Sequence, residues 1–320
     1  MASQKTMDIV KSTAPVLQVH GEKITEVFYN LLFQNHPELR DVFNMTHQKK
    51  GSQLKALANA VYQYAVHIDK LEMLGGAVES IAQKHTSLSV PKEAYPIVGE
   101  NLLSAIKIVL GDAATPDVID AWAEAYGDLA AIFVTREEDI YTSRENQIGG
   151  FRGLKEFVIA EKVEESSVIT SFHLKRKDGE PVPKYKAGQY IALTIEIPGT
   201  EHKHTRNYSL SDSIDKDYLR ISVKKEPGNP EGIVSNYLHA SVEAGSVVNI
   251  GMPSGEFVLE ETKNPIVFIG AGVGVTPLLS MLKEAKSAGI KGVSFIQCVL
   301  NSSTHAFENE IRNTIEEKSK

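Results

Sequence analysis

The side chain with the clearest potential for chemistry is His85. Leu74, Val78 and Ile81 recur at helical spacing before it, and His85 continues this apolar stripe. A histidine on a buried helix face needs a partner for each ring nitrogen. It is either a core histidine with both nitrogens hydrogen-bonded, the commoner case for a lone histidine, or a metal ligand, because neutral imidazole binds iron. His85 by itself leaves both interpretations open.

Several side chains earlier in the sequence are unusual for a plain helical bundle. Gln53 falls on the inward side of its predicted helix, one turn before Leu57. Phe43 lies six residues after Pro37, which begins a helix. Each has an ordinary interpretation: Tyr29 as a half-buried tyrosine, Gln53 as a surface amide and Phe43 as a core aromatic. Taken one at a time, these residues do not establish a site.

Together with His85, these residues resemble the globin pattern. The resemblance implies a haem b pocket with Pro37 as the corner proline, Phe43 against the haem, His85 as the proximal iron ligand, Gln53 in the distal position, and Tyr29 reaching in beside Leu57. Distal hydrogen-bond donors decide whether a haem protein stores oxygen or activates it. A phenol and an amide aimed at one oxygen would hold it tightly for reaction in place.

The residues around His85 resemble one branch of the globins, the bacterial and yeast flavohaemoglobins. The similarity rests on Lys84, on Tyr95 and on Glu137 near the end of the last helix. It implies that Glu137 accepts the proton of the ligating imidazole, that Tyr95 supports it, and that Lys84 lies where haem and flavin meet. Such a carboxylate makes histidine a stronger donor to iron. From the residues alone, Glu137 is instead one member of a solvated acidic run, residues 137–139.

A second group of residues could bind a flat cofactor that carries phosphate. In Arg206-Asn207-Tyr208-Ser209, a strand would place Arg206 and Tyr208 on one face, where a guanidinium suits pyrophosphate and a ring can stack. Tyr190 adds a second aromatic, and Val234-Ser235-Asn236 begin a helix whose backbone N–H groups suit a phosphate. The ordinary interpretation is an exposed strand face. In order and spacing, these pieces resemble the flavin domain of the ferredoxin-reductase family, which implies that they hold FAD.

The third group is a glycine-rich turn between an apolar strand at 266–269 and a predicted helix from Leu278 to about Ala288. Its sequence is Gly270-Ala271-Gly272-Val273-Gly274-Val275-Thr276, and we expect Thr276 to cap the helix. A strand, a glycine-rich turn and a helix bind dinucleotide pyrophosphate, although this turn lacks the third glycine of the full fingerprint. After a flavin barrel, it resembles the nicotinamide-binding part of the same reductase family, which implies NAD(P)H.

Three modules in series must position these groups. Residues 1–147 show helical periodicity without strand alternation, which predicts an all-α domain, by resemblance a globin. A glycine-rich joint at 146–153 precedes short strands separated by glycine turns, which predict an antiparallel FAD-binding β-barrel over 150–262. Residues 263–320 then begin an incomplete α/β NAD(P)-binding domain. The predicted strands of the barrel are 157–163, 168–175, 190–197, 218–224 and 247–250.

The flavohaemoglobin pattern continues past Lys320 with further strands, a Cys-Gly-Pro element and an aromatic that covers the flavin. A doubly wound sheet reverses its strand order beside the first strand. We therefore expect the strand at 266–269 to lack a neighbour and to expose an apolar edge. We also expect this to impair NAD(P)H binding.

Composition excludes several classes of protein. The net charge of −7 over 320 residues argues against nucleic-acid partners and against an anionic membrane surface. We find neither a signal-peptide pattern nor an apolar run of about 18 residues, so we expect a cytoplasmic protein without stable membrane association. Cys298 is the only cysteine, which excludes an intrachain disulfide and a cysteine-built metal site. We expect a monomer whose partners are small molecules.

The resemblance implies a nitric oxide dioxygenase, which converts nitric oxide and oxygen to nitrate with electrons passed from NAD(P)H to FAD and then to haem. One alternative is a haem-based oxygen or nitric oxide binding globin with an impaired reductase part. Another is a haem-linked flavin reductase for other acceptors, such as lipid hydroperoxides. A third is a helical bundle joined to a flavin reductase without haem.

Overall fold

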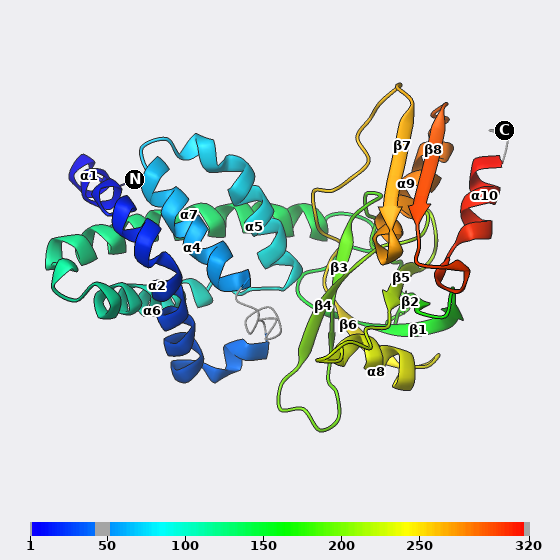
Figure 1. Ribbon diagram of the computed structural model, residues 1–320, viewed down its shortest axis with the longest axis horizontal. Helices are drawn as coiled ribbons and strands as arrows, with labels where there is room; N and C mark the ends of the chain where they lie inside the picture. Colours follow the sequence, from blue (N-terminus) through cyan, green and yellow to red (C-terminus); the bar gives the residue numbers. More distant parts are fainter. Residues whose placement is uncertain (1, 42–51, 317–320) are drawn as a thin grey trace. The chain divides into compact units, whose positions relative to one another are not determined.

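The computed structural model describes residues 2–41 and 52–316 and divides the chain into two compact units (Figure 1). We call residues 1–85 and 90–140 the helical unit, and residues 86–89 and 141–320 the mixed unit. Each unit has its own hydrophobic core. The predicted fold class, an all-α part followed by an antiparallel sheet and an α/β part, is confirmed.

The described part of the helical unit contains helices without strands. Its elements are α1 (Gln4–Ser12), α2 (Ala14–Asn35), η1 (Pro37–Asp41), α4 (Ser52–His67), η2 (Leu71–Leu74), α5 (Gly75–Ser87), α6 (Ala94–Leu110), η3 (Gly111–Ala113) and α7 (Pro116–Glu145). The Thr115 hydroxyl accepts a hydrogen bond from the Val118 N–H at 3.4 Å and caps the start of α7. The apolar stripes of α2, α4, α6 and α7 meet in one core, which includes Leu17, Ile24, Phe28, Leu32, Ile106 and Trp122.

Helices α2 and α4 pack closely and antiparallel. A Cβ on Gly21 would lie 3.4 Å from the Cβ of Ala58, so the two backbones approach each other where the residues are small. One turn further along α2, the Thr25 hydroxyl donates to the Leu54 carbonyl at 3.1 Å. Residues 21 and 25 of α2 thus lie against residues 58 and 54 of α4. The turn of α2 that follows residue 25 therefore lies near the beginning of α4.

The first part of the mixed unit is a six-stranded antiparallel sheet. Its strands are β1 (Lys155–Glu164), β2 (Ile169–Arg176), β3 (Tyr190–Ile195), β4 (His204–Ser209), β5 (Leu219–Lys224) and β6 (Val247–Ile250), in the order β4-β3-β6-β1-β2-β5. An isolated bridge between Leu210 and Ile221 joins the ends of this order, which closes the sheet into the predicted barrel. Fully buried side chains fill it, including Phe157, Phe172, Ile191, Leu193 and Leu219. Helix α8 (Ile233–Ser241) packs on this core through Val234 and Leu238.

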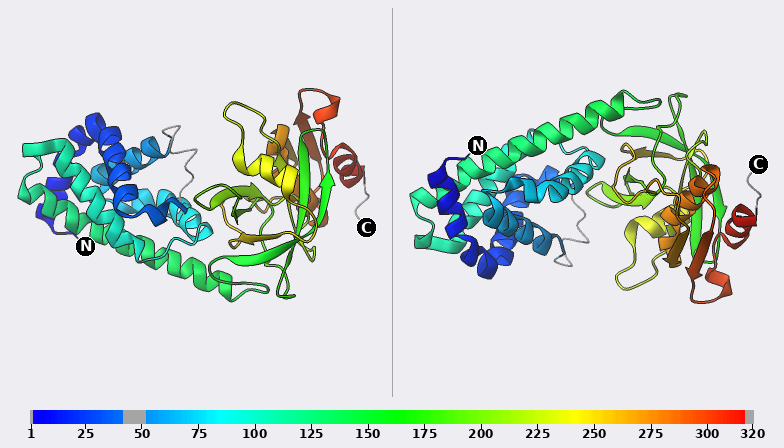
Figure 2. Two further views of the ribbon diagram at one scale, coloured as in Figure 1. Left: turned by 90° about the horizontal axis from the view of Figure 1, so that it is seen from below. Right: turned by 90° about the horizontal axis from the view of Figure 1, so that it is seen from above.

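The second part of the mixed unit is a strand–helix–strand motif with a parallel strand pair. Its elements are β7 (Ile266–Ala271), η4 (Gly272–Gly274), α9 (Val275–Ser287), β8 (Val293–Cys298), η5 (Ser302–Thr304) and α10 (Glu308–Glu316). Figure 2 shows these orange and red elements from two sides. Phe268 of β7 is buried in the same core as Leu279 of α9 and Ile311 of α10. The helices therefore cover one face of the strand pair.

The other face of this strand pair is apolar and exposed. Val267 and Ile269 of β7 are 56% and 67% exposed, and Ile296 of β8 is 49% exposed. In the described residues, β7 pairs with β8 alone. The apolar surface that we expected at the strand 266–269 is present, and it extends over a face of the sheet as well as its edge.

One sequence-based expectation about this motif is wrong. Thr276 is not the N-cap of the helix, because α9 already begins at Val275 and Gly274 is the cap. The Thr276 hydroxyl instead donates to the Val273 carbonyl at 2.9 Å from inside the first turn. Strand β8 ends at Cys298, and Leu300 beyond it is 93% exposed.

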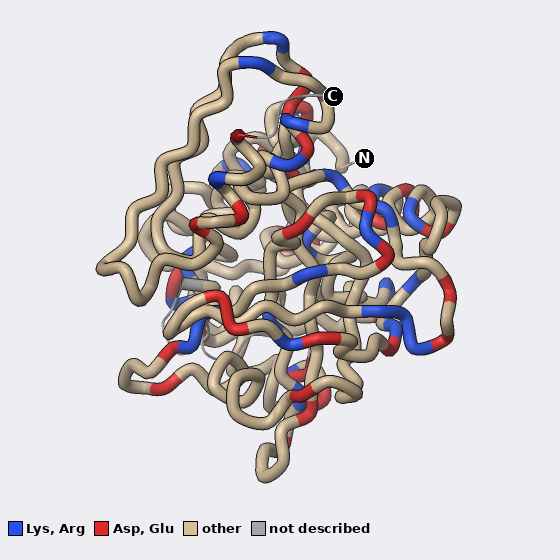
Figure 3. The backbone as a smooth tube through the Cα atoms, turned by 90° about the vertical axis from the view of Figure 1, so that its right-hand side faces the viewer, with Lys and Arg blue, Asp and Glu red and all other residues tan. Residues whose placement is uncertain are grey.

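Acidic and basic residues alternate along the chain without long runs of one sign. Figure 3 shows acidic and basic residues intermixed along the backbone, which accords with the modest net charge of −7. Among the described helices, none combines the length and the apolar character that crossing a membrane requires.

Candidate functional site

Helix α5 directs His85 toward a buried carboxylate on α7. The His85 Nδ1 lies 2.8 Å from Glu137 Oε1, and Glu137 is 3% exposed. A carboxylate at Nδ1 fixes the neutral imidazole as the tautomer that carries its proton there. The Nε2 lone pair then points away from the carboxylate, which is the arrangement of a metal-binding histidine.

Tyr95, at the start of α6, completes this group. Its hydroxyl donates to the same Glu137 Oε1 at 2.5 Å and lies 3.1 Å from His85 Nδ1. A buried carboxylate needs such donors because burial without them is costly. The structure therefore brings together three residues that lie far apart in the sequence and that the resemblance grouped. We call His85, Tyr95 and Glu137 the proximal triad.

Two aromatic residues that sequence reasoning left unassigned support the proximal triad. The Phe133 ring lies 5.8 Å from the His85 ring and stacks on Tyr95 at 6.4 Å. The Tyr126 hydroxyl donates to the Tyr95 carbonyl at 2.6 Å. Both residues lie on the inward stripe of α7, the one sequence signal that could have marked them.

The antiparallel contact of α2 and α4 brings the turn of α2 that carries Tyr29 toward the beginning of α4, where Gln53 lies. Tyr29 lies one turn after Thr25, and Gln53 is next to Leu54, the partner of Thr25. Burial raises the pKa of Tyr29 to about 12, so its phenol remains a hydrogen-bond donor at neutral pH. Its ring stacks with Phe33 at 5.9 Å.

Gln53 carries a buried polar atom that no described residue satisfies. Its Oε1 is buried and has no hydrogen-bond partner in the part of the chain that the structure describes. An unsatisfied buried amide is costly in a folded protein and commonly marks a place where a further group binds. This atom and the proximal triad fit a haem with one histidine ligand.

The remaining residues predicted for the haem pocket have different outcomes. Leu57 is partly buried and packs against the helical core. Lys84 lies exposed on α5, next to His85. Phe43 lies outside the described residues. Among the residues that are described, no three His, Cys, Asp or Glu side chains cluster as a metal site.

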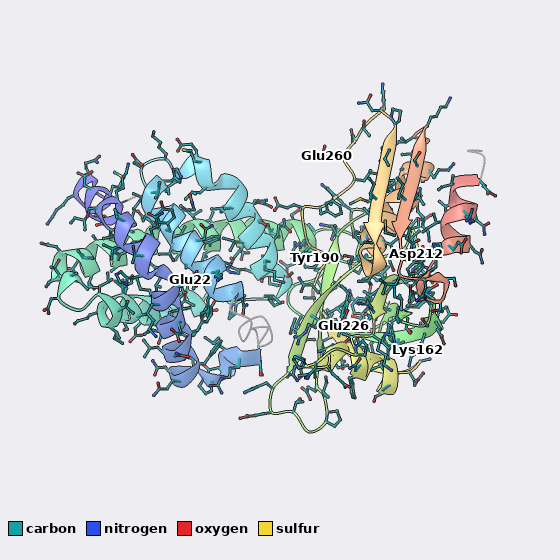
Figure 4. All side chains as sticks on the ribbon, in the orientation of Figure 1. Glu22, Lys162, Tyr190, Asp212, Glu226 and Glu260 are labelled. Atoms are coloured by element: carbon teal, nitrogen blue, oxygen red, sulfur yellow. The ribbon has the colours of Figure 1, made fainter. Side chains whose placement is uncertain are left out.

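The residues predicted for FAD lie on two neighbouring strands of the barrel. Tyr190, labelled in Figure 4, pairs with Ser209 across β3 and β4, and its phenol shares a hydrogen bond with Asn207. Tyr208 pairs with Ile191, so alternation places Tyr208 and Arg206 on the opposite face from Tyr190. The predicted common face of Arg206 and Tyr208 is therefore observed.

The environment of Arg206 suits an anion. Burial lowers the pKa of the Arg206 guanidinium, and its Nη1 donates to the Thr205 carbonyl at 2.8 Å. A partly desolvated guanidinium gains more from a phosphate than an exposed one does. Burial also raises the pKa of Tyr208, so this ring presents a neutral surface for stacking.

The start of α8 forms a narrow cradle around Gly232. A Cβ at this position would lie 2.4 Å from Ser235 Oγ and 2.8 Å from Glu226 Cβ, so only glycine fits. Asn236 has a buried Oδ1 without a hydrogen-bond partner among the described residues. Backbone N–H groups at such a helix start favour phosphate oxygens. Val234 is buried in the barrel core and acts through packing.

The glycine-rich turn has the geometry that its sequence predicted. Gly270 lies so close to α9 that a Cβ would meet Leu278 Cδ1 at 2.9 Å, and Gly272 has a φ of +51°. Around Gly274 an added Cβ would meet nothing within 4 Å, which leaves the backbone open to a ligand. The segment from Gly270 to Thr276 therefore turns directly into the N-terminus of α9, where a dinucleotide pyrophosphate binds in such motifs.

Comparisons with known proteins match both units. A family model described as Globin matches residues 26–133, and one described as Oxidoreductase FAD-binding domain matches residues 156–259. The flavohemoprotein of Halalkalibacterium halodurans is 50% identical over 317 residues, which cover 98% of this chain and 77% of the relative. That of Bacillus subtilis is 49% identical over 313 residues, which cover 97% and 77%.

A solved structure extends this similarity to the fold. The flavohemoglobin of Malassezia yamatoensis, solved with bound FAD and heme, matches with a TM-score of 0.85 at 27% identity. The match covers 98% of this chain and 81% of that chain. With its helical unit, its antiparallel barrel and its relatives, the chain belongs to the flavohemoprotein family.

Proposed function

We propose that this protein is an NAD(P)H-dependent nitric oxide dioxygenase, which converts nitric oxide and oxygen to nitrate. The observation that carries the proposal is the proximal triad, in which the Nδ1 of His85 is 2.8 Å from a buried glutamate oxygen. When bound, haem b supplies an iron that carries oxygen, and FAD divides the two-electron hydride of NAD(P)H into single electrons. His85 holds the haem iron.

The proximal residues tune the donor strength of the imidazole. Glu137 accepts the hydrogen bond from the Nδ1–H of His85 and shifts electron density toward Nε2, so the imidazole would be a strong donor to a haem iron. Tyr95 keeps the Glu137 oxygen in place through its 2.5 Å hydrogen bond. Lys84, exposed beside His85, adds positive charge that favours the arrival of an electron.

The distal residues hold the substrate oxygen. The Tyr29 phenol, with its raised pKa, donates a hydrogen bond throughout the physiological pH range. The Gln53 amide offers a second polar group, and Leu57 limits the space beside it. This arrangement retains oxygen for reaction with nitric oxide.

The mixed unit delivers electrons in this proposal. Tyr190, Arg206, Asn207, Tyr208 and Ser209 of β3 and β4 would hold FAD, Ser235 and Asn236 would face its phosphate at the start of α8, and Val234 would anchor that helix start in the barrel core. The turn from Gly270 through Ala271, Gly272, Val273, Gly274 and Val275 to Thr276 holds NAD(P)H. We assign the haem domain to residues 1–147, the FAD domain to 150–262 and the partial NAD(P) domain to 263–320.

An absorption spectrum followed by a turnover assay tests the proposal. Purified protein should show a haem Soret band and flavin bands, and NADH should reduce the haem under anaerobic conditions. With oxygen present, consumption of nitric oxide should produce an equal amount of nitrate. A protein without a Soret band, or one that consumes NADH without forming nitrate, would overturn the proposal.

A second candidate function is an oxygen or nitric oxide binding globin with an impaired reductase part. It is favoured by the exposed apolar face of β7, where Val267 and Ile269 are 56% and 67% exposed. Such exposure is uncommon in a finished nucleotide-binding sheet, which has helices on both faces. Under this alternative, dithionite reduces the haem and NADH does not.

The proposal also includes a cytoplasmic monomer that takes oxygen and nitric oxide as its partners. Cys298 is the one cysteine in the sequence, so the chain needs no oxidising compartment for disulfide formation. Size-exclusion chromatography with light scattering at several protein concentrations tests the monomeric state.

A further inference from the structure

Helix α5, which carries His85, packs on α7 through a small apolar cluster. The buried apolar cluster between α5 and α7 consists of Ala82, Phe133 and Ile140, with Val78 and Ile81 of α5 partly buried against it, and it is separate from the main core of the helical unit. Ala82 is the one fully buried apolar residue that α5 contributes to it. Weak apolar packing leaves the axial position and rotation of a helix poorly determined. Polar contacts between the two helices therefore add to the determination of how α5 lies against α7.

A forked ion pair joins the same two helices. Arg136 of α7 donates through Nε to Glu79 Oε2 at 2.6 Å and through Nη2 to Glu79 Oε1 at 3.1 Å. Gln83, one turn along α5, donates to Glu79 Oε1 at 2.8 Å and holds the carboxylate on its own helix. Two parallel hydrogen bonds between a guanidinium and a carboxylate fix orientation as well as distance.

The ion pair and the proximal triad act at two points on one helix. Glu79 precedes His85 by six residues, which is about 9 Å along the axis of α5. On α7, Arg136 is the neighbour of Glu137, so both contacts start from the same turn. A single contact would let α5 rotate about it. Two contacts at different heights fix both rotation and register.

We propose that the Arg136–Glu79 ion pair positions His85 for its hydrogen bond to Glu137 and thereby sets the donor strength of the imidazole toward iron. Arg136 and Glu79 are positioning residues that act through α5. Loss of the pair would allow α5 to shift and would lengthen the bond from Nδ1 to Oε1, now 2.8 Å. The imidazole would then become a weaker donor.

The inference rests on haem ligation by His85, which is part of the proposed function. Its test uses the full chain loaded with haem, with two readouts other than turnover: the iron–histidine stretching band of the ferrous protein and the haem midpoint potential. In Arg136→Gln the band should move to lower frequency and the potential should rise. Both shifts should have the direction expected for Glu137→Gln and a smaller size.

Conservative and paired variants separate positioning from general charge effects. Arg136→Lys should recover part of the shift, because lysine keeps one charged hydrogen bond and loses the fork. Glu79→Gln should reproduce Arg136→Gln, and the double variant should add nothing, because either change removes the whole pair. Shifts that add in the double variant would overturn the proposal, as would an unchanged band and potential in Arg136→Gln.

Lys11→Gln is a matched control. It removes the ion pair of Lys11 with Asp69, which has a 2.7 Å contact and side-chain exposures of 42% and 33%, close to the 41% and 27% of Arg136 and Glu79. Lys11→Gln should leave both readouts unchanged, and equal shifts in it would overturn the positioning role. An absent iron–histidine band in the unsubstituted protein would refute haem ligation itself, which is a different failure.

Discussion

At the scale of single residues, the chemistry of this protein depends on which atom of each side chain is already hydrogen-bonded. The Nδ1 of His85 is bonded to a carboxylate, so Nε2 is the atom that can bind iron. The Oε1 of Gln53 is buried without a partner in the described chain, which makes it available to a bound group. Histidine and glutamine are common residues, and it is the hydrogen bonding of their individual atoms that gives His85 and Gln53 distinct roles.

Replacement of Glu137 tests the proximal side. In Glu137→Gln the neutral amide is a weaker acceptor for the Nδ1 proton, so turnover of nitric oxide should fall by about 10–100-fold, the usual cost of losing a partner of a metal-binding histidine. Tyr95→Phe should have a smaller effect, because His85 keeps its 2.8 Å contact with the carboxylate. Stopped-flow assays on protein with an equal Soret absorbance measure both. A normal rate in Glu137→Gln would contradict the assignment.

Replacement of Tyr29 tests the distal side. Tyr29→Phe removes a donor worth about 1.5–3 kcal/mol to a charged acceptor, so oxygen should dissociate about 10–100-fold faster. Because burial raises the pKa of Tyr29 to about 12, the phenol stays protonated. The dissociation rate of the unsubstituted protein should therefore be constant between about pH 6 and about pH 10. Flash photolysis across this range measures it, and a rise near pH 10 would show that the phenol titrates earlier.

At the scale of elements, helix spacing determines where the proximal residues lie. Tyr126 of α7 fits against Gly99 of α6, where an added Cβ would lie 2.5 Å from the tyrosine ring. The same tyrosine donates to the Tyr95 carbonyl. The small residue on α6 therefore allows the contact that supports Tyr95.

A pair of glycine substitutions tests this packing. Gly99→Ala should destabilise the protein by about 1–3 kcal/mol, because the ring of Tyr126 must move within a packed core. Gly127→Ala is the matched control on α7, since an added Cβ there meets nothing within 4 Å. It should stabilise the protein by about 0.5–1 kcal/mol through helix propensity. Urea denaturation measures both, and equal effects of the two changes would argue against the close approach.

At the scale of the whole molecule, the mixed unit depends on a buried charge network between its barrel and its strand–helix–strand motif. Asp212, labelled in Figure 4, lies in the loop after β4 and pairs with Lys283 of α9 and with Arg220 of β5. Glu310 of α10 pairs with the same two cations. Burial by itself would raise the pKa of Asp212, but Arg220 and Lys283 outweigh it and lower the pKa to about 2.

The lowered pKa of Asp212 determines how the stability of the protein depends on pH. A carboxyl with a lowered pKa stabilises the folded state fully above its unfolded pKa near 3.8, and the stabilisation is lost as the pH falls through about 2. Asp212→Asn should therefore cost about 2 kcal/mol at neutral pH, and its difference from the unsubstituted protein should shrink below about pH 4. Urea denaturation at several pH values measures this difference.

Asp178 is a natural comparison for Asp212. Its pKa is also lowered to about 2, with the hydrogen bond from Arg176 as the main cause, but its carboxylate is exposed. Solvent screens exposed pairs, so Asp178→Asn should change stability much less than Asp212→Asn. A larger effect at Asp178 would show that the network around Asp212 contributes little.

The sequence by itself determined the modules and most of their elements. The apolar stripes of α2, α4, α6 and α7 and the short strands β1, β2 and β6 follow from periodicities of 3.6 and 2 residues, which depend on neighbours along the chain. The error at Thr276 has the same origin, since a cap and a first-turn residue differ by a backbone angle that residue type does not specify. The resemblance to the flavohaemoglobins identified the residues of the proximal triad, and their roles in haem binding are proposed.

Only the tertiary structure decided how distant side chains meet. The pairing of Arg136 with Glu79 spans 57 residues, and that of Asp212 with Lys283 spans 71. No local pattern encodes such contacts, because each depends on the angle and register at which two elements pack. The unsatisfied amide of Gln53 is likewise a property of its surroundings. The periodicity of a sequence indicates which face of a helix is buried, whereas the packing of the elements determines which residues that face contacts.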